Sequence, residues 1–310
     1  MRYFPDEPRP AEWRAPVVAI GNFDGLHRGH VKILERVAKQ AAERGATPLA
    51  LTFDPHPPRV VRPDKAPPLL MTPAQKIEAL RQAGAHGVAV VRFTHELSQW
   101  SPEAFVERVL VDWLRVAEVW VGGNFLFGRD RLGNFSLLRL LGQQHGYRAE
   151  KIDPVRYKDF VVSSTRIRRL VAEGRVDEAA ALLGHHYMVA GIVVEGDRRG
   201  RTIGFPTANL ACENELLPPD GVYATLVLTD EAARPAVTNV GVRPTVRAAG
   251  PRVVESHLLD FSGDLYGRTV RVAFLRRLRD ERRFPDIEAL RVQIEADVTA
   301  ARTLFQRISL

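Results

Sequence analysis

The chain has few of the residues that mark disulfide-stapled, membrane-spanning or low-complexity proteins. Its 310 residues include one cysteine, Cys212, which excludes an internal disulfide and indicates a reducing compartment. The sequence contains no Cys/His group with zinc-site spacing, no internal repeat, and no apolar run long enough to cross a bilayer. Residues 1–16 hold no apolar signal segment. These absences predict a cytoplasmic globular protein without a membrane partner.

The composition provides enough apolar material for more than one core. Hydrophobic residues make up 45% and charged residues 26%, and the length is typical of about two domains.

The net charge of +7 suits a nucleic-acid partner or phosphorylated small molecules. The basic residues form no dense run and are not interleaved with aromatic residues, so we predict no nucleic-acid partner. A basic nucleic-acid-binding protein is the alternative from another class, and a steep salt dependence would reveal it.

The first half of the chain alternates strand-like and helix-like segments. Helical spacing appears at 29–44, and Thr72-Pro73 and Ser101-Pro102 combine a capping hydroxyl with a proline at the first helical position. The apolar runs that read as strands are residues 17–20, 47–53, 87–93 and 117–121. This alternation predicts a Rossmann-like parallel sheet with helices on both faces, which binds ligands at the carboxyl ends of its strands.

The second half has a different pattern. A polar helical stretch at 163–184, divided by Gly174, is the predicted connection between domains. Five β-rich runs separated by Gly, Pro and Asp turns follow it, at 187–194, 221–228, 235–240, 253–261 and 269–278. They predict a small antiparallel barrel. An amphipathic helix starts after Asp286, with its apolar stripe at Ile287, Leu290, Ile294, Val298, Ala301, Phe305 and Ile308. We therefore expect domains at 1–184, including the connection, and 185–310.

A first candidate site follows the first strand and opens the first helix. Residues 21–30 read GNFDGLHRGH, in which His27, Gly29 and His30 form an H-x-G-H pattern. A helix N-terminus attracts phosphate through its free N–H groups, and imidazoles donate to oxygens that gain charge in a transition state. The pattern favours a nucleotide phosphate site over a polar turn with two surface histidines.

Four sequence blocks, taken together, resemble a known family. They are GNFDGLHRGH at 21–30, TFDPHP at 52–57, GGNFLFGRDRLGN at 122–134 and SSTRIR at 163–168. Within the nucleotidyltransferase superfamily they look like the adenylyltransferase module of the bacterial bifunctional riboflavin kinase/FAD synthetases, and they occur in that family's order. The resemblance implies that the FMN phosphate attacks the α-phosphorus of ATP and that pyrophosphate leaves.

The resemblance also implies roles for individual residues. His27 and His30 would hold the ATP phosphates with Mg2+, and Arg168 would neutralise the transferring phosphates. His56 and Asn124 would lie near the flavin. The further residues expected to bind ATP or phosphate are Gly21, Asn22, Phe23, Asp24, Gly29, Ser164 and Thr165. For Asn22 and Asp24 a turn-forming role is as well supported by the residues alone.

One block departs from the family pattern. Family members often show Asp-Phe-Arg-Phe-Gly where this chain has Asn124 at the first position and Leu126 at the third. The departure leaves open an alternative, a riboflavin kinase with weak or lost adenylyltransferase activity.

A second candidate site lies in the β-rich half. Thr207 and Asn209 are two residues apart, so on an extended segment they point to the same side and suit an Mg2+-bound phosphate. Gly200 and Gly204 allow the preceding loop to fold over phosphates. This stretch and the blocks at 238–246, 254–261 and 264–284 resemble the riboflavin kinase module. That resemblance implies that Glu255 is the base that accepts the proton of a ribityl hydroxyl.

The sequence thus predicts a bifunctional enzyme with ATP, riboflavin, FMN and FAD as substrates and products and Mg2+ as its metal cofactor. It leaves the oligomeric state open.

Overall fold

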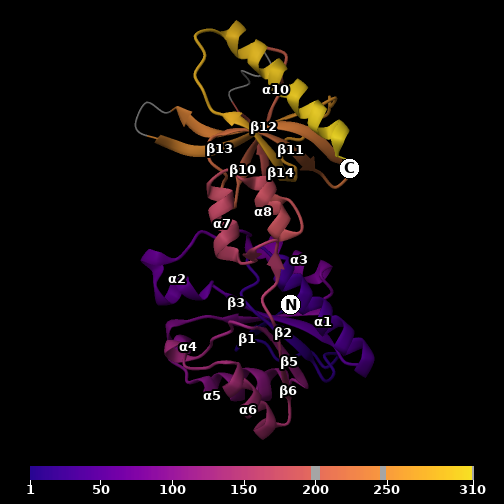
Figure 1. Ribbon diagram of the computed structural model, residues 1–310, viewed down its shortest axis with the longest axis vertical. Helices are drawn as coiled ribbons and strands as arrows, with labels where there is room; N and C mark the ends of the chain where they lie inside the picture. Colours follow the sequence, from indigo (N-terminus) through magenta and orange to yellow (C-terminus); the bar gives the residue numbers. More distant parts are fainter. Residues whose placement is uncertain (197–202, 245–248, 309–310) are drawn as a thin grey trace. The chain divides into compact units, whose positions relative to one another are not determined.

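The computed structural model describes residues 1–196, 203–244 and 249–308. The chain folds into two compact units (Figure 1). The first comprises Met1–Pro68 and Pro73–Ser164, and the second comprises Leu69–Thr72 and Thr165–Leu310. Gly200 lies outside the described residues, so its predicted phosphate contact has no structural counterpart here.

A six-stranded sheet forms the centre of the first unit, in the order β1-β4-β3-β2-β5-β6. Every neighbouring pair of these strands is parallel. The strands are β1 (Arg2–Phe4), β2 (Val17–Ile20), β3 (Pro48–Asp54), β4 (Gly87–Arg92), β5 (Glu118–Gly122) and β6 (Arg148–Ile152). The chain order reverses beside β2, and such reversals are where open parallel sheets bind ligands.

Helices cover this sheet, which is buried on both faces. The main ones are α1 (Arg28–Arg44), α3 (Pro73–Gln82), α5 (Pro102–Phe105) with the π-helix η2 (Val106–Leu114), and α6 (Phe135–His145). Shorter turns are α2 (Pro57–Val61), η1 (Pro63–Lys65), α4 (His95–Ser98), η3 (Arg129–Arg131) and the hairpin β7 (Arg156–Tyr157) and β8 (Phe160–Val161). Ile20 and Leu51 pair in register and belong to the core that includes η2 and α6, while α1 contacts β2, β3 and β5.

The predicted parallel sheet with helices is confirmed, and all four predicted strands are present within about one residue of their expected bounds. Ser101 caps α5 as predicted, because its hydroxyl accepts from the N–H of Ala104 at 3.2 Å. Strands β1 and β6, which form the two edges of the sheet, were not predicted from the sequence. Edge strands bury less apolar surface, so their periodicity is weaker.

Two helices, α7 (Ser164–Ala172) and α8 (Val176–Leu183), precede the strands of the second unit and are separated by Gly174 at a φ of 76°. A closed barrel follows, with neighbouring strands antiparallel in the order β10-β13-β12-β11-β14-β9. Its strands are β9 (Tyr187–Val194), β10 (Ala208–Cys212), β11 (Gly221–Leu228), β12 (Ala233–Pro244), β13 (Ala249–Leu258) and β14 (Thr269–Asp280). The predicted antiparallel barrel is confirmed.

The barrel interior carries a chain of hydroxyls as well as apolar side chains. Thr238 Oγ1 lies 2.6 Å from Thr225 Oγ1 and 2.8 Å from Ser256 Oγ, and none of the three residues is exposed. These bonds link β11, β12 and β13 from inside. They also mark which residues of each strand point inward.

The predicted final helix is present as α10 (Ile287–Arg307), which packs on the outside of the barrel. Asp286 caps it by accepting from the N–H of Ala289 at 2.7 Å. Buried Ala301 and Leu304 pack with Val222 of β11. Asp297 forms a buried bidentate ion pair with Arg279 of β14, at 2.8 to 3.0 Å. The predicted apolar stripe is wrong at its start, because Ile287 is 67% exposed in the first turn.

Candidate functional site

The loop between β2 and α1 is tightly wound at the carboxyl end of the sheet. Phe23, Gly25 and Leu26 all have positive φ, at 50°, 84° and 37°. Two non-glycine residues in this region indicate a backbone that its surroundings hold in place. Phe23 and Asp24 are buried, at 0% and 4% exposure. The Ser164 hydroxyl donates to the Asp24 carbonyl at 2.8 Å, which ties the fourth sequence block to the first.

His27 and His30 form a stacked pair at the start of α1. Their ring centroids are 3.6 Å apart with 14° between the planes, and the Phe23 ring packs edge-on against His30. His27 is the N-cap, and its Nδ1 accepts from the backbone N–H of His30 at 3.3 Å. Because Nδ1 is the acceptor, the proton of the neutral ring is on Nε2, which is then a donor.

Burial keeps both rings neutral. It lowers the pKa of His27 from 6.5 to about 4. Burial also lowers the pKa of His30 well below its usual value, with a smaller contribution from His27. His30 Nδ1 is buried and makes no hydrogen bond within the described part of the chain. A phosphate at this helix terminus would therefore meet N–H donors on neutral rings.

Gly29 allows His27 to occupy its position. A Cβ at Gly29 would lie 3.1 Å from Cε1 and 3.2 Å from Nδ1 of His27, closer than most side-chain contacts. Similarly, a Cβ at Gly21 would lie 3.2 Å from the Phe23 ring. The glycines of the block thus make room for the rings as well as for a ligand.

The other predicted residues of this site are placed as follows. Asn22 is exposed, and its carbonyl accepts from the buried Thr52 hydroxyl at 3.3 Å. His56 is 8% exposed and precedes α2 at the end of β3. Asn124 is exposed in the loop after β5. Thr165 and Arg168 lie on α7, in the second unit.

Lys76 of α3 is a site-adjacent residue that the sequence analysis missed. Its Nζ donates to the Phe53 carbonyl at 3.2 Å, at the end of β3. Burial lowers the pKa of this ammonium, while the carboxylates of Asp54 and Asp24 act in the opposite direction. Lys76 therefore places a cation close to both strand ends that carry sequence blocks. Lys76 is a single lysine in a helix and is distant in sequence from both blocks, so no sequence pattern marks it as a site residue.

The second candidate site lies on the outer face of the barrel. Glu255 of β13 pairs in register with Asn209 of β10 on one side. The flanking residues Val254 and Ser256 are fully buried, which directs Glu255 outward. Thr207 directly precedes β10, two residues from Asn209 as predicted, and is intermediate in exposure. The structure thus brings together Asn209 and the carboxylate predicted to be the base.

Asn209 is unusually enclosed for an outward-facing residue. It is 8% exposed, and a Cβ at Gly196 would overlap its carboxamide. Its Oδ1 is buried and has no hydrogen-bond partner among the described residues. A buried amide oxygen without a partner is costly in a protein and is a good ligand for Mg2+. The donor set therefore fits that cation, although the described residues contain no cluster of three or more His, Cys, Asp or Glu that could hold a metal.

His257 is a second residue that the sequence analysis did not single out. It lies two residues after Glu255 on β13. Its Nδ1 is 2.9 Å from the Pro206 carbonyl, and its ring packs edge-on against Phe205. Because a carbonyl only accepts, Nδ1 carries the proton. His257 thereby fixes the segment that leads into Thr207, and Gly204, at a φ of 89°, forms the turn before it.

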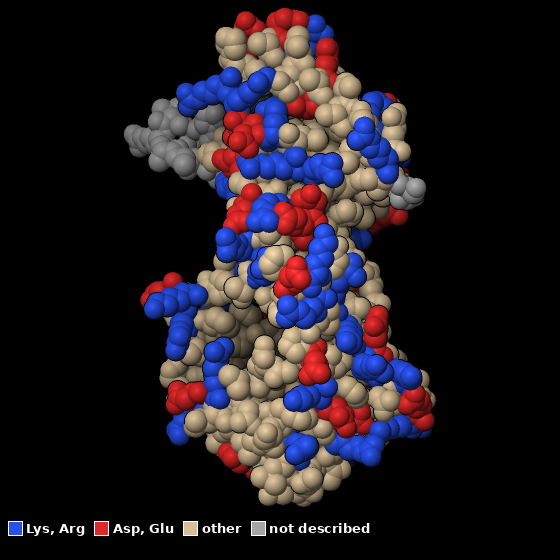
Figure 2. Space-filling model, in the orientation of Figure 1, with Lys and Arg blue, Asp and Glu red and all other residues tan. Residues whose placement is uncertain are grey.

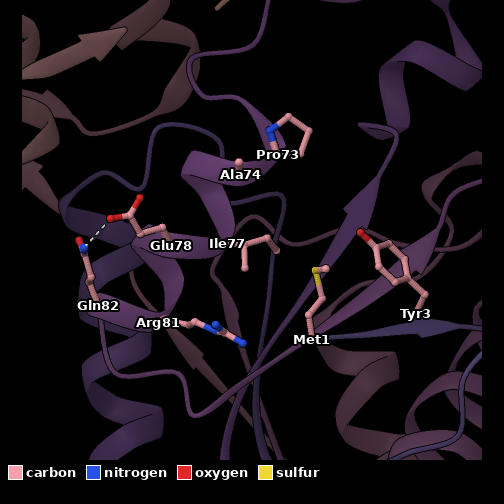
Figure 3. Close-up of a pocket in the computed structure, with 8 residues that line it drawn as sticks. All are labelled: Met1, Tyr3, Pro73, Ala74, Ile77, Glu78, Arg81 and Gln82. Carbon is pink, nitrogen blue, oxygen red and sulfur yellow. Dashed lines mark hydrogen bonds between the residues drawn. The ribbon is translucent and has the colours of Figure 1, made fainter. Parts of the chain in front are cut away.

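A cavity of about 420 Å3 lies between β1 and α3 (Figure 3). Its lining consists of Met1, Tyr3, Pro73, Ala74, Ile77, Glu78, Arg81 and Gln82, and includes none of the predicted site residues. At its rim, Gln82 Nε2 donates to Glu78 Oε1 at 3.0 Å.

On the molecular face shown in Figure 2, basic and acidic residues are interspersed. Within the described ranges, we find no helix with the length and apolarity needed to span a membrane.

Two family models match the chain, one for each half. The model described as FAD synthetase matches residues 9–166, and the model described as riboflavin kinase matches residues 183–305. The two matches are in the same order as the two sites. The histidine pair lies within the first match, and Thr207, Asn209 and Glu255 lie within the second.

Characterised relatives resemble the chain over nearly its whole length. The bifunctional riboflavin kinase/FMN adenylyltransferase of Pseudomonas fluorescens is 41% identical over 94% of both chains. The protein of the same name from Escherichia coli K12 is 38% identical over 93% of this chain and 92% of its own. A solved structure from Streptococcus pneumoniae, described as a macrolide-efflux protein, has a TM-score of 0.84 at 28% identity and covers 96% of each chain.

Proposed function

Since the chain belongs to the family of bifunctional riboflavin kinase/FMN adenylyltransferases, we propose that its two sites act in succession on one flavin. The barrel phosphorylates riboflavin to FMN, and the parallel-sheet unit transfers adenylate from ATP to FMN, giving FAD and pyrophosphate. One observation in each unit supports the assignment of the sites. The first unit has a neutral histidine stack at a helix N-terminus, and the barrel has a carboxylate beside Asn209. We place the functional boundary between the activities at residues 184 and 185.

Adenylyl transfer needs alignment and charge neutralisation more than proton removal. An FMN phosphate oxygen forms a bond to the α-phosphorus of ATP, and the bond from that phosphorus to the bridging oxygen breaks. The attacking phosphate is already an anion near neutral pH, so no base is required. His27 Nε2 and the His30 ring donate to the ATP phosphates, and the N-terminus of α1 adds its dipole. The neutral rings require no counter-ion before ATP arrives.

The remaining residues of the first block set the shape of the phosphate site. Gly21, Asn22, Phe23, Asp24 and Gly29 form the loop, and Ser164 holds it through the Asp24 carbonyl. Thr165 and Arg168 of α7 supply a hydroxyl and a cation to the phosphates. His56 and Asn124 contact the flavin. These roles rest on the family resemblance together with the positions of the residues at strand ends and helix starts.

Riboflavin phosphorylation differs because its acceptor is an alcohol. The terminal ribityl oxygen forms a bond to the γ-phosphorus of ATP, the bond to the β,γ-bridging oxygen breaks, and ADP leaves. The hydroxyl proton passes to the Glu255 carboxylate. The outward direction of Glu255 and its register with Asn209 support this role.

Mg2+ is the cofactor that the barrel site fits. Thr207 and Asn209 would hold it through a neutral hydroxyl and the buried Oδ1, which adds ligands without adding negative charge beside ATP. When bound, the cation neutralises charge on the phosphates.

We also propose that the chain acts in the cytoplasm on small molecules, without a nucleic-acid or membrane partner. Turnover that fell steeply with ionic strength would contradict this part of the proposal.

The test is a chromatographic separation of flavins after incubation with ATP and Mg2+. The full-length protein should convert riboflavin to FMN and then FAD, and should convert FMN to FAD in a second tube. His30→Ala should accumulate FMN, while Glu255→Gln should lose FMN formation and still convert FMN to FAD. Matched controls are His145→Ala and Glu213→Gln, substitutions outside the two sites in the same units. FMN without FAD from the unaltered chain would favour the kinase-only alternative, and full activity in either site variant would overturn its assigned role.

A further inference from the structure

The ammonium of Lys76 lies at the carboxyl end of β3, where two sequence blocks of the first unit come together. Its Nζ donates to the Phe53 carbonyl at 3.2 Å, and Phe53 is three residues before His56. The Asp24 carboxylate, three residues before His27, lies close enough to favour the charged form of this ammonium. Lys76 is therefore next to the loop proposed to hold ATP and to the strand end proposed to hold the flavin.

The helix that carries Lys76 turns this side chain toward the sheet. Leu80, one turn later on the same face of α3, is fully buried, and Lys76 itself is intermediate in exposure. Helix α3 contacts β4, which is the neighbour of β3 in the sheet. The helix and the bond to the Phe53 carbonyl together hold the ammonium at the edge of the sheet where ligands bind.

The ammonium retains donors that a ligand can use. It carries three N–H groups, and in the part of the chain that the structure describes one of them is used, on the Phe53 carbonyl. The carboxylates of Asp54 and Asp24 act on its charge, and Asp24 is 4% exposed. Two carboxylates close to a site for two phosphorylated substrates repel both substrates. A cation at this position offsets that repulsion and can also bind an anion directly.

The position of Lys76 favours the phosphate of FMN over the phosphates of ATP. We assigned the ATP phosphates to His27, His30 and the N-terminus of α1, all of which follow β2. The FMN phosphate has to reach the α-phosphorus from the flavin subsite, which we placed near His56, after β3. Strand β3 pairs directly with β2, and Lys76 contacts the end of β3. A phosphate that extends from one strand end toward the other therefore comes to this ammonium.

We propose that Lys76 binds the phosphate of FMN during adenylyl transfer: its ammonium donates to the oxygens that do not attack and lowers the repulsion between this phosphate and ATP. This inference rests on the adenylyl transfer proposed for the first unit. No proton moves to or from Lys76, and the bonds that form and break are those of the transfer itself. Because the contact is made to the acceptor substrate, its loss affects FMN kinetics more than ATP kinetics.

The experiment measures FMN-to-FAD conversion by full-length Lys76→Gln against the concentration of each substrate. Glutamine keeps an N–H donor at this position but has no charge. We expect kcat/KM for FMN to fall about 10-fold or more, the scale for loss of a charge-assisted hydrogen bond, with a smaller change in the KM for ATP. Lys76→Arg keeps a cation and should recover most of the loss. Lys39→Gln, the same change at an exposed lysine of α1, is the matched control.

Lumiflavin separates a phosphate contact from a distorted flavin subsite. It has the ring system of FMN without the ribityl phosphate and serves as a competitive inhibitor against FMN. Its inhibition constant should agree within about 2-fold between Lys76→Gln and the unaltered protein. An inhibition constant that rises with the KM for FMN would overturn the proposal, because Lys76 would then shape the flavin subsite. A KM for ATP that rises as much as the KM for FMN would also overturn it, because lost support of the loop at 21–27 would account for the whole effect.

The outcomes distinguish this inference from the proposed function. An unaltered protein that does not convert FMN to FAD would refute the proposed adenylyl transfer. Conversion by the unaltered protein, together with unchanged FMN kinetics in Lys76→Gln, would refute only the further inference. Should Lys76→Gln fail to fold, Lys76→Met gives the same comparison of FMN, ATP and lumiflavin, because it also lacks the charge. Riboflavin phosphorylation in the same samples reports on the other unit and should be unchanged in every variant.

Discussion

The Nδ1 atom of His27 accepts a hydrogen bond of 3.3 Å from the backbone N–H of His30, while the two rings stack with 3.6 Å between centroids. One side chain therefore caps the helix and forms half of the proposed phosphate site. The cap determines the tautomer, and burial makes protonation of either ring unfavourable. Stability and nucleotide binding are coupled in these two residues.

This coupling predicts a pH-dependent stability of the first unit. Folding lowers the pKa of His27 from 6.5 to about 4, so the unfolded chain binds more protons between these values and stability falls as the pH decreases. Between pH 7 and pH 5 the loss from this residue is about 2 kcal/mol. His27→Asn keeps an N-cap acceptor but cannot titrate. The calorimetric unfolding transition of its first unit should therefore shift less with pH than that of the unaltered protein.

The control for that measurement is the unfolding transition of the other unit in the same samples. It should depend on pH equally in both proteins. A His27→Asn variant with the full pH dependence of the original chain would show that the lowered His27 pKa does not contribute to stability.

Gly29→Ala tests whether the glycine makes room for the His27 ring. The added Cβ would lie 3.1–3.2 Å from ring atoms and should displace the imidazole, which reduces FMN-to-FAD conversion about 10-fold or more through weaker ATP binding. Alanine favours a helix over glycine by about 1 kcal/mol, so stability should not fall. Steady-state rates against ATP concentration measure the effect. An unchanged KM for ATP and kcat would refute the crowding argument.

Lys76→Met tests the buried cation near the two strand ends. Methionine retains most of the side-chain volume but removes the bond to the Phe53 carbonyl and leaves Asp24 and Asp54 without the nearby ammonium. We expect FMN-to-FAD conversion to fall about 10-fold, since the loop at 21–27 would lose its electrostatic support, with kinase activity unchanged. Lys39→Met, at an exposed lysine on α1, is the control. Equal activity in both variants would assign Lys76 no part in the site.

The sequence was most informative where periodicity and turn chemistry coincide with burial. Residues 17–20 and 187–194 are strands at the predicted positions, and the H-x-G-H pattern lies at a helix start as expected. The edge strands β1 and β6 carry short, partly exposed patterns that resemble loops. Lys76 and His257 could not be found from the sequence alone. Their importance depends on which residue is across a strand or behind a loop, and only tertiary pairing determines that.

The same limit applies to the buried ion pair between Arg279 and Asp297. Asp297 is 5% exposed and belongs to a helix whose predicted stripe was apolar, so its position indicated a solvent-facing charge. The structure instead places it against β14, where it receives hydrogen bonds from Arg279 and, at 2.7 Å, from Gln293. The ion pair joins α10 to β14 of the barrel, a contact that was not predicted from the sequence.

Asp297→Asn should therefore destabilise the barrel unit selectively. The substitution leaves the Arg279 guanidinium, whose side chain is 19% exposed, opposite a neutral amide, at a cost of at most about 3 kcal/mol. Heat inactivation of riboflavin phosphorylation should shift to lower temperature, while that of FMN-to-FAD conversion stays in place because the first unit is intact. The double variant Arg279→Met/Asp297→Leu should recover much of the loss, since removing both charges also removes the desolvation penalty. If the single and double variants inactivate at the same temperature, the pair does not contribute through its charges, and α10 is held by its apolar contacts alone.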